Sequence, residues 1–164
     1  MTGADVAVRA LADADAGWAR ELLAARMGSE VVAGHGKLMR PLELPGLVAE
    51  IAGRPVGLLT YRIDERGCEI VTIHSAREGE GAGSALIAAV GAEALGAGCR
   101  RLWVMTTNDN LRALRFYQRR GFRLAAVRPG AVDEARRTLK PEIPETGEDG
   151  IPIRDEIDLE MDLT

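Results

Sequence analysis

The feature that most constrains the fold is a glycine-rich junction between an apolar run and a helical pattern. The stretch IHSAREGEGAGSALIAAV (73–90) places Gly79, Gly81 and Gly83 at alternate positions. Glycine costs conformational entropy on folding, so its repeated use here needs a reason. Either the turn is geometrically difficult for other residues, or a bound group must approach the backbone closely.

Two common phosphate-binding patterns do not fit this junction. A dinucleotide fingerprint needs a third glycine where Ser84 or Leu86 stands, depending on which glycine begins the motif. A Walker loop needs GK followed by Ser or Thr, but in GHGKL (34–38) the next residue is Leu38. What remains is a strand, G-x-G-x-G and a helix, which leaves backbone N–H groups at a helix N-terminus. These groups form a predicted anion site that suits a pyrophosphate.

Three strand-like runs precede the junction and are joined by short turns. They are GLVAEIAG (46–53), RPVGLLTYRID (54–64) and GCEIVTIHS (67–75). Short connections between such runs favour hairpins, so the sequence predicts an antiparallel meander.

Hydrophobic periodicity assigns most of the remaining chain. Further strands are predicted at 5–11, 99–107, 122–129 and 156–163, and helices at 13–27, 82–98 and 108–121. Asn108 or Asp109 is expected to cap the last helix. We expect a short helical piece and then a loop at 28–45. The connection 130–155 is long enough to be functional or mobile. The sequence therefore predicts one α+β domain over 1–164.

Composition and charge exclude several classes of protein. The chain has 164 residues, a net charge of −4 and no long Lys/Arg block, so nucleic-acid and membrane-surface partners are not expected. No apolar stretch reaches bilayer length, and the N-terminus lacks a signal-peptide pattern. Cys68 and Cys99 are not a disulfide framework or a metal motif, so we interpret them as small buried residues in a reducing cytoplasm. No metal site is expected.

Two segments together resemble the GNAT superfamily of acyl-CoA-dependent N-acetyltransferases. EIVTIHSAREGEGAGSALI contains the glycine junction, and NLRALRFYQRRGF (110–122) is similar to the second motif of that family. The resemblance spans the order of elements from position 5 to 163. It implies a three-layer αβα fold, with a mixed, mostly antiparallel sheet of about seven strands between helices.

The resemblance also implies acetyl-CoA as the cosubstrate, with named contacts. Backbone N–H groups of one loop would bind the pyrophosphate: Glu78, Gly79, Glu80, Gly81, Ala82, Gly83 and Ser84. The pantetheine arm would pair with Val71, Thr72 and Ile73. Asn110, Ala113 and Tyr117 are spaced by three and four residues and therefore share one side of their helix, which would face the cosubstrate.

The implied reaction is direct attack by a primary amine in a ternary complex. A backbone N–H near Ile73 would polarise the thioester carbonyl, and Tyr117 resembles the general acid of the family. One departure concerns Glu78, where the family commonly has Arg or Gln. Glu78 and Glu80 should weaken CoA binding unless they point to solvent, and Arg77 would offset part of their charge.

Several residues admit two interpretations. Glu69 is interpreted either as a general base that acts through water, or as a solvated strand carboxylate. His35 is interpreted either as a proton relay or as an exposed loop residue. Tyr117 is the acid or only a core aromatic. The acidic residues of 156–163 form a solvated face or attract a cationic acceptor. His74 is interpreted as structural.

The acceptor is a small-molecule amine or a peptide, and the resemblance places the acceptor-facing parts at 28–45 and 130–155. A homodimer is possible, because the last strands of this fold often lie at dimer interfaces. One alternative function is a non-catalytic acyl-CoA-binding sensor or interaction module. A third is a purely structural domain that does not bind CoA.

Overall fold

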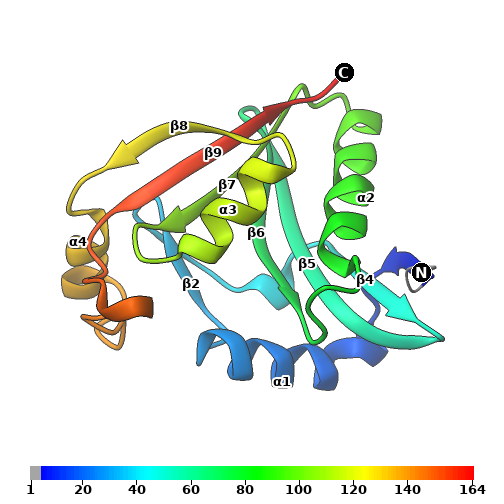
Figure 1. Ribbon diagram of the computed structural model, residues 1–164, viewed down its shortest axis with the longest axis horizontal. Coiled ribbons are helices and arrows are strands. Elements are labelled where there is room, and N and C mark those ends of the chain that lie inside the picture. The colour runs from blue at the N-terminus through cyan, green and yellow to red at the C-terminus, as the bar shows by residue number, and fades with distance from the viewer. Residues whose placement is uncertain (1–4) are drawn as a thin grey trace. The chain divides into compact units, whose positions relative to one another are not determined.

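The computed structural model describes residues 5–164 and has the predicted α+β architecture (Figure 1). Seven strands form one sheet in the order β1-β4-β5-β6-β7-β9-β8. They are β1 (Val6–Ala10), β4 (Gly46–Ile51), β5 (Arg54–Asp64), β6 (Gly67–Ser75), β7 (Arg101–Thr107), β8 (Arg123–Arg128) and β9 (Glu156–Asp162). The four α-helices are α1 (Ala16–Met27), α2 (Ala82–Gly96), α3 (Leu111–Arg119) and α4 (Ala131–Thr138).

Most strand pairs in this sheet are antiparallel. This holds for β1–β4, β4–β5, β5–β6 and β8–β9. The chain passes from β6 to its neighbour β7 through α2, and helical crossovers of this kind join parallel strands. The predicted fold class, a mixed and mostly antiparallel sheet of seven strands with flanking helices, is confirmed.

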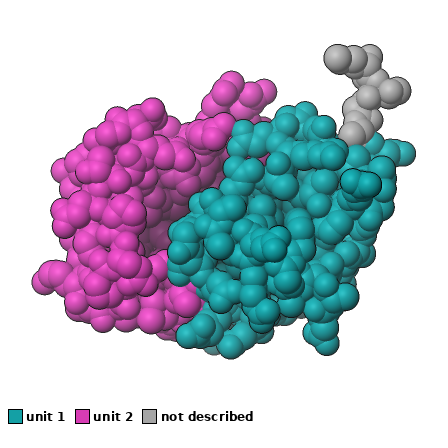
Figure 2. Space-filling view, turned by 90° about the horizontal axis from the view of Figure 1, so that it is seen from below, with its two compact units in different colours: residues 1–30, 40–102, 163–164 teal, residues 31–39, 103–162 magenta. Residues whose placement is uncertain are grey.

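The described residues form two compact units, coloured teal and magenta in Figure 2. Unit 1 contains the described residues up to Glu30, Arg40–Leu102 and Leu163–Thr164, and unit 2 contains Val31–Met39 and Trp103–Asp162. Each unit is assembled from segments that are far apart in the sequence. The single domain over 1–164 stays a prediction.

In unit 1, α1 and α2 cover opposite faces of the strands. Leu58 of β5 belongs to a buried cluster with Leu22 and Leu23 of α1. At its neighbour Gly57, an added Cβ would lie 3.1 Å from Leu86 of α2. Consecutive strand residues point to opposite faces, so unit 1 has the helix–sheet–helix layering that was predicted.

The predicted meander is confirmed. β5 and β6 have the bounds expected from the sequence, and they pair through a two-residue turn from Asp64 to Gly67. Gly67 has a φ of 117°, and an added Cβ there would lie 2.4 Å from the Arg101 carbonyl oxygen. Glycine is required at this position because another strand end approaches the backbone.

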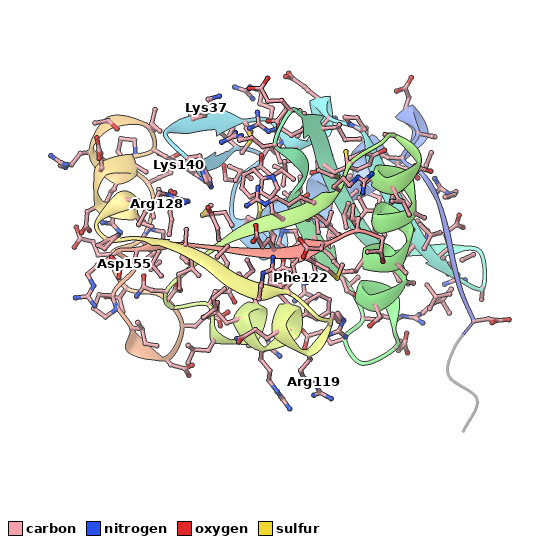
Figure 3. All side chains as sticks on the ribbon, turned by 90° about the horizontal axis from the view of Figure 1, so that it is seen from above. Lys37, Arg119, Phe122, Arg128, Lys140 and Asp155 are labelled. Atoms are coloured by element: carbon pink, nitrogen blue, oxygen red, sulfur yellow. The ribbon has the colours of Figure 1, made fainter. Side chains whose placement is uncertain are left out.

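Unit 2 contains β8 and β9, with α3 packed next to β8 and α4 next to a small hairpin. The hairpin pairs β2 (Val32–Gly34) with β3 (Lys37–Met39). Lys140, just after α4, donates from Nζ to the Val31 carbonyl at 2.7 Å. Figure 3 shows Lys140 next to the hairpin that carries Lys37.

The expectation of a short helical piece followed by a loop at 28–45 was wrong. The hairpin occupies 32–39, and a single 3-10 turn follows at Pro41–Glu43. His35 and Gly36 both have positive φ, 51° and 74°, which suits a two-residue hairpin turn. His-Gly is not one of the usual dipeptides of such a turn, such as Asn-Gly or Asp-Gly, so the sequence did not signal the hairpin.

The connection 130–155 is more regular than expected. It begins with α4, whose N-cap is Gly130 in a left-handed conformation, and it continues with a bridge between Thr146 and Pro152. Helices in the described part of the chain are all too short or too polar to span a bilayer.

Candidate functional site

The glycine junction of unit 1 forms a left-handed turn that opens α2. Gly79 and Gly81 have φ values of 78° and 87°, and Gly81 is the N-cap residue. No side chain caps this end of α2, and its first turn holds no acidic residue. N–H groups at a helix start carry partial positive charge, so this end of α2 is suited to an anion.

The start of this turn is held by two hydrogen bonds to backbone carbonyls. The Ala76 N–H donates to the Val56 carbonyl at 2.7 Å, and Ser75 Oγ donates to the Arg77 carbonyl at 2.7 Å. At Gly79, an added Cβ would meet no atom within 4 Å, so the space on that side of the residue is open.

The carboxylate of Glu80 has a cationic neighbour. Arg77 Nη1 lies 3.6 Å from Glu80 Oε2, and both side chains are partly exposed. Partly exposed pairs contribute little to stability. Here the guanidinium offsets part of the negative charge beside the turn, as the sequence suggested.

The pairing of β6 with β5 is irregular at Val71, the first of the three predicted residues Val71–Ile73. Thr60 pairs with Thr72 and Tyr61 pairs with Ile70, so Val71 has no partner on β5. Such bulges bend a strand and occur frequently beside active sites. On one side of the bulge, the hydroxyls of Thr60 and Thr72 are 2.7 Å apart and form a hydrogen bond between β5 and β6.

Glu69 of β6 is not a solvated carboxylate, so that interpretation was wrong. The residue is 4% exposed, and Arg62 Nε donates to its Oε2 at 2.6 Å. A buried carboxylate needs a partner, and Arg62 supplies it. The general-base interpretation stays a prediction.

The second group of predicted residues lies on α3 in unit 2. Asn110 is the N-cap residue, and its Oδ1 accepts from the Ala113 N–H at 3.1 Å. The sequence predicted Asn108 or Asp109 as the cap, and that prediction was wrong. Asn110 and Ala113 are partly buried and Tyr117 is buried, whereas Arg112 and Arg115 are exposed, so the first three mark what we call the inner side of α3. That this side faces the cosubstrate stays a prediction.

Tyr117 is both a core aromatic and a residue of that inner side. Its ring makes edge contacts with Phe116 at 5.3 Å and Phe122 at 5.4 Å. Burial raises the pKa of the Tyr117 phenol above its ordinary value. The phenol is therefore protonated at neutral pH, as a proton donor must be.

The acidic side of β9 is not solvated along its whole length. Glu156 and Asp158 are buried, and the Arg128 guanidinium binds both, with Nη2 2.8 Å from Glu156 Oε1 and Nη1 2.7 Å from Asp158 Oδ2. The interpretation as a solvated face fails for these two residues. It holds for Asp162, which is exposed.

His35 joins this network and is not an exposed loop residue. Its Nε2 lies 2.9 Å from Asp158 Oδ1, and its ring contacts Trp103 edge-on at 5.0 Å. Burial opposes the Asp158 charge, but hydrogen bonds from Arg128 and His35 outweigh it and hold the pKa of this carboxyl below its usual value. Alternating charge along β9 did not reveal these partners, because they come from distant parts of the chain.

Cys68 and Cys99 are free and buried, which confirms the prediction that both are buried residues. Burial raises the pKa of the Cys68 thiol to about 12. Within residues 5–164, no group of three His, Cys, Asp or Glu side chains is arranged to hold a metal ion.

The chain is similar to known acetyltransferases. Residues 15–122 match the model of the acetyltransferase (GNAT) family. The relative "uncharacterized protein YdhI" of Bacillus subtilis (strain 168) is 46% identical over 138 residues, which cover 84% of this chain and 86% of YdhI.

Solved structures show the same fold. An acetyltransferase of Bacillus subtilis in complex with CoA matches 98% of this chain and 100% of its own, with a TM-score of 0.75 and 19% identity. A GNAT family acetyltransferase from Elizabethkingia anophelis with acetyl-CoA bound matches 96% of this chain and 98% of its own, with a TM-score of 0.72 and 21% identity.

Proposed function

Because the chain belongs to the acetyltransferase (GNAT) family, we propose that it transfers an acetyl group from acetyl-CoA to a primary amine. CoA or acetyl-CoA is bound in the two solved relatives described above, which supports acetyl-CoA as the donor. The acceptor is a small-molecule amine or a peptide amine. A homodimer and a cytoplasmic location belong to the same proposal.

One observation carries this proposal: left-handed Gly81 opens α2 with no side-chain cap. A helix start of this kind offers N–H groups to an anion. In the proposal, the N–H groups of Glu78–Ser84 bind the pyrophosphate of acetyl-CoA. Open space at Gly79 and the pairing of Glu80 with Arg77 support this assignment.

The pantetheine arm is assigned to β6 and α3. Val71, Thr72 and Ile73 pair with it beside the bulge of β6, at which Val71 lacks a partner on β5. Asn110 and Ala113 contact it from the first turn of α3. The Ile73 N–H polarises the thioester carbonyl and stabilises the oxyanion that develops on attack.

The chemistry balances with two proton transfers. The amine nitrogen forms a bond to the acetyl carbon, and the carbon–sulfur bond of the thioester breaks. Glu69 accepts a proton of the amine through water, and Tyr117 donates its proton to the leaving CoA thiolate. No acyl-enzyme forms, and the buried Cys68, whose pKa is raised by burial, supports a mechanism without a thiolate nucleophile.

A panel assay tests this proposal. The purified protein is mixed with acetyl-CoA and a panel of small amines and peptides, and release of the CoA thiol is followed while acetylated products are identified by mass spectrometry. We expect at least one acceptor to yield acetylated amine and CoA in equal amounts.

The non-catalytic sensor is the second candidate. The observation that favours it is Glu69, a base candidate that is 4% exposed and already ion-paired with Arg62. If acetyl-CoA binds and the whole panel stays unmodified, the sensor function replaces the enzyme. If acetyl-CoA does not bind at all, both functions are excluded.

A further inference from the structure

The segment that follows α4 is fastened to the turn that opens α3. This segment, residues 139–155, contains KPEIPETGEDGIPIRD and belongs to the part of the chain that the family resemblance places near the acceptor. It folds into a narrow loop, in which the Gly147 N–H donates to the Ile151 carbonyl at 2.8 Å and the Ile153 N–H donates to the Glu145 carbonyl at 2.9 Å. Arg136 holds both arms of the loop through the carbonyls of Pro144 and Ile153.

Asn108 binds this loop through both its side chain and its backbone. Its Oδ1 accepts from the N–H groups of Arg154 at 2.9 Å and Asp155 at 3.0 Å. Its Nδ2 donates to the Pro152 carbonyl at 2.9 Å. The Asn108 backbone N–H also donates to the Asp155 carbonyl at 3.1 Å. Figure 3 shows Asp155 at the end of the segment, beside the start of β9.

Asp109 holds the tip of the same loop. This carboxylate is buried, and it accepts from the Thr107 hydroxyl at 2.5 Å and from the Glu148 N–H at 3.3 Å. An added Cβ at Gly147 would lie 1.9 Å from Asp109 Oδ2, so only glycine allows this approach. The Asp109 carboxylate therefore joins the end of β7 to the loop tip.

Asn110, the next residue, is the N-cap of α3. Only Asn108, Asp109 and Asn110 separate β7 from α3, and each of them is hydrogen-bonded. The Asn110 N–H donates to the Thr107 carbonyl at 3.1 Å. Because the turn is this short, a shift of Asn108 or Asp109 moves Asn110 and the first turn of α3 with it.

We propose that Asn108 and Asp109 are positioning residues for acetyl-CoA binding: by fastening the 139–155 segment, they fix Asn110 and the inner side of α3. This inference rests on the proposed function, which assigns Asn110 to the pantetheine arm. All atoms of the fastening lie within unit 2. Small displacements of positioning groups weaken binding and turnover even when the fold is kept.

The test disrupts these contacts with one variant in the turn before α3 and one variant in the loop. Asn108→Ala removes the side-chain bonds to Pro152, Arg154 and Asp155 but keeps the backbone bond to Asp155, and Gly147→Ala pushes the loop tip away from Asp109. Lys140→Met is the matched control, because it loosens the same segment only where it contacts Val31. Calorimetric titration with acetyl-CoA gives affinity and stoichiometry, and hydrogen exchange of peptides covering 150–155 reports whether the loop is released.

We expect Asn108→Ala and Gly147→Ala to raise the Kd for acetyl-CoA about ten-fold at unchanged stoichiometry. Lys140→Met should keep the wild-type Kd. The double variant should bind no more weakly than either single variant, because both break one connection. A merely structural role would lower the stoichiometry and leave the Kd of the folded fraction unchanged.

Wild-type Kd values in variants whose loop exchanges rapidly would overturn the inference. If Gly147→Ala does not fold, Asn108→Asp takes its place, since it keeps the acceptor for Arg154 and Asp155 but loses the donor to Pro152. Its Kd should lie between the wild-type and Asn108→Ala values. Absence of acetyl-CoA binding by the wild type would instead reject the proposed function, and this inference would fall with it.

Discussion

At the residue scale, Tyr117 shows how one side chain combines packing with a proposed proton transfer. Its ring is fixed between Phe116 and Phe122, and α3 directs it to the same side as Ala113. Burial raises its pKa, so the phenol carries a proton at the pH of the reaction. The ring contacts confirm the core interpretation of Tyr117, and the general-acid interpretation stays a prediction.

Tyr117→Phe separates these two roles, because it keeps the aromatic ring and removes only the hydroxyl. General acids contribute a factor of about 100 or more, so we expect turnover to fall by roughly that factor while the Kd for acetyl-CoA stays within about two-fold of wild type. Steady-state kinetics of thiol release measures the first quantity and calorimetry the second.

The matched control is Tyr61→Phe, which changes the only other tyrosine of the chain. It should keep full turnover, since Tyr61 lies on β5 and has no assigned role in the reaction. Equal turnover in Tyr117→Phe and the wild type would remove Tyr117 from the mechanism.

Single residues also mark the limits of the sequence analysis. Glu156 and Asp158 alternate with apolar residues along β9, a pattern typical of a solvated face. They are buried because Arg128 and His35 reach them from β8 and from the hairpin turn. Partners brought together by tertiary structure leave no signal in local periodicity, so this network could not be predicted.

At the element scale, the best predictions came where turn chemistry and hydrophobic pattern agree. β5 and β6 have the expected bounds, since glycine and charged residues mark the turn between two clear β patterns. The start of α2 was predicted for a similar reason, with Gly81 as the last residue before the helix. The β2–β3 hairpin was missed because its strands have three residues each and its turn uses His35.

The strand β6 also contains His74, whose pKa is lowered by its surroundings. His74 pairs with Leu58, and Leu58 belongs to the cluster with α1, so the imidazole lies on the α1 side of the strand. Burial and the charge of Arg26 lower the pKa of His74 from 6.5 to about 4. The sequence interpretation of His74 as structural agrees with this position.

His74 should make stability depend on pH in the mildly acidic range. Between pH 6.5 and about 4 the unfolded chain binds a proton at this residue that the folded chain does not, so the free energy of unfolding falls as the pH is lowered. The loss should reach about 3 kcal/mol near pH 4. Urea unfolding of the wild type and of His74→Asn at a series of pH values measures it.

We expect His74→Asn to have a flatter profile between pH 6.5 and pH 4. Above pH 7 the imidazole is neutral in both states, so the two proteins should then differ by a constant amount. Parallel profiles over the whole range would show that His74 does not cause the acid sensitivity.

At the scale of the whole molecule, the order of the elements could be predicted from the sequence, but most of the contacts that hold distant segments together could not. All seven strands of the sheet and three of the four α-helices were expected near their observed positions. α4 and the loop after it were not, because Arg136, Asn108 and Asp109 hold that segment through backbone carbonyls and N–H groups. Such contacts depend on geometry and leave no pattern of apolar residues.

The proposed function depends on the glycine turn before α2, which we propose to hold the pyrophosphate of acetyl-CoA. Gly81 is left-handed, so Gly81→Val both strains the backbone and covers N–H groups. Gly96, at the far end of the same helix, meets no atom within 4 Å when a Cβ is added. Gly96→Ala is therefore a matched change that leaves the turn intact.

The most direct measurement is calorimetric titration of the wild type, Gly81→Val and Gly96→Ala with acetyl-CoA, after any co-purified ligand has been removed. We predict low-micromolar binding by the wild type and by Gly96→Ala, with Gly81→Val at least about ten-fold weaker. Absence of binding by the wild type at millimolar acetyl-CoA would contradict the account. The carboxylates of Glu78 and Glu80 would then close the anion site, and the glycines would serve only to shape a turn.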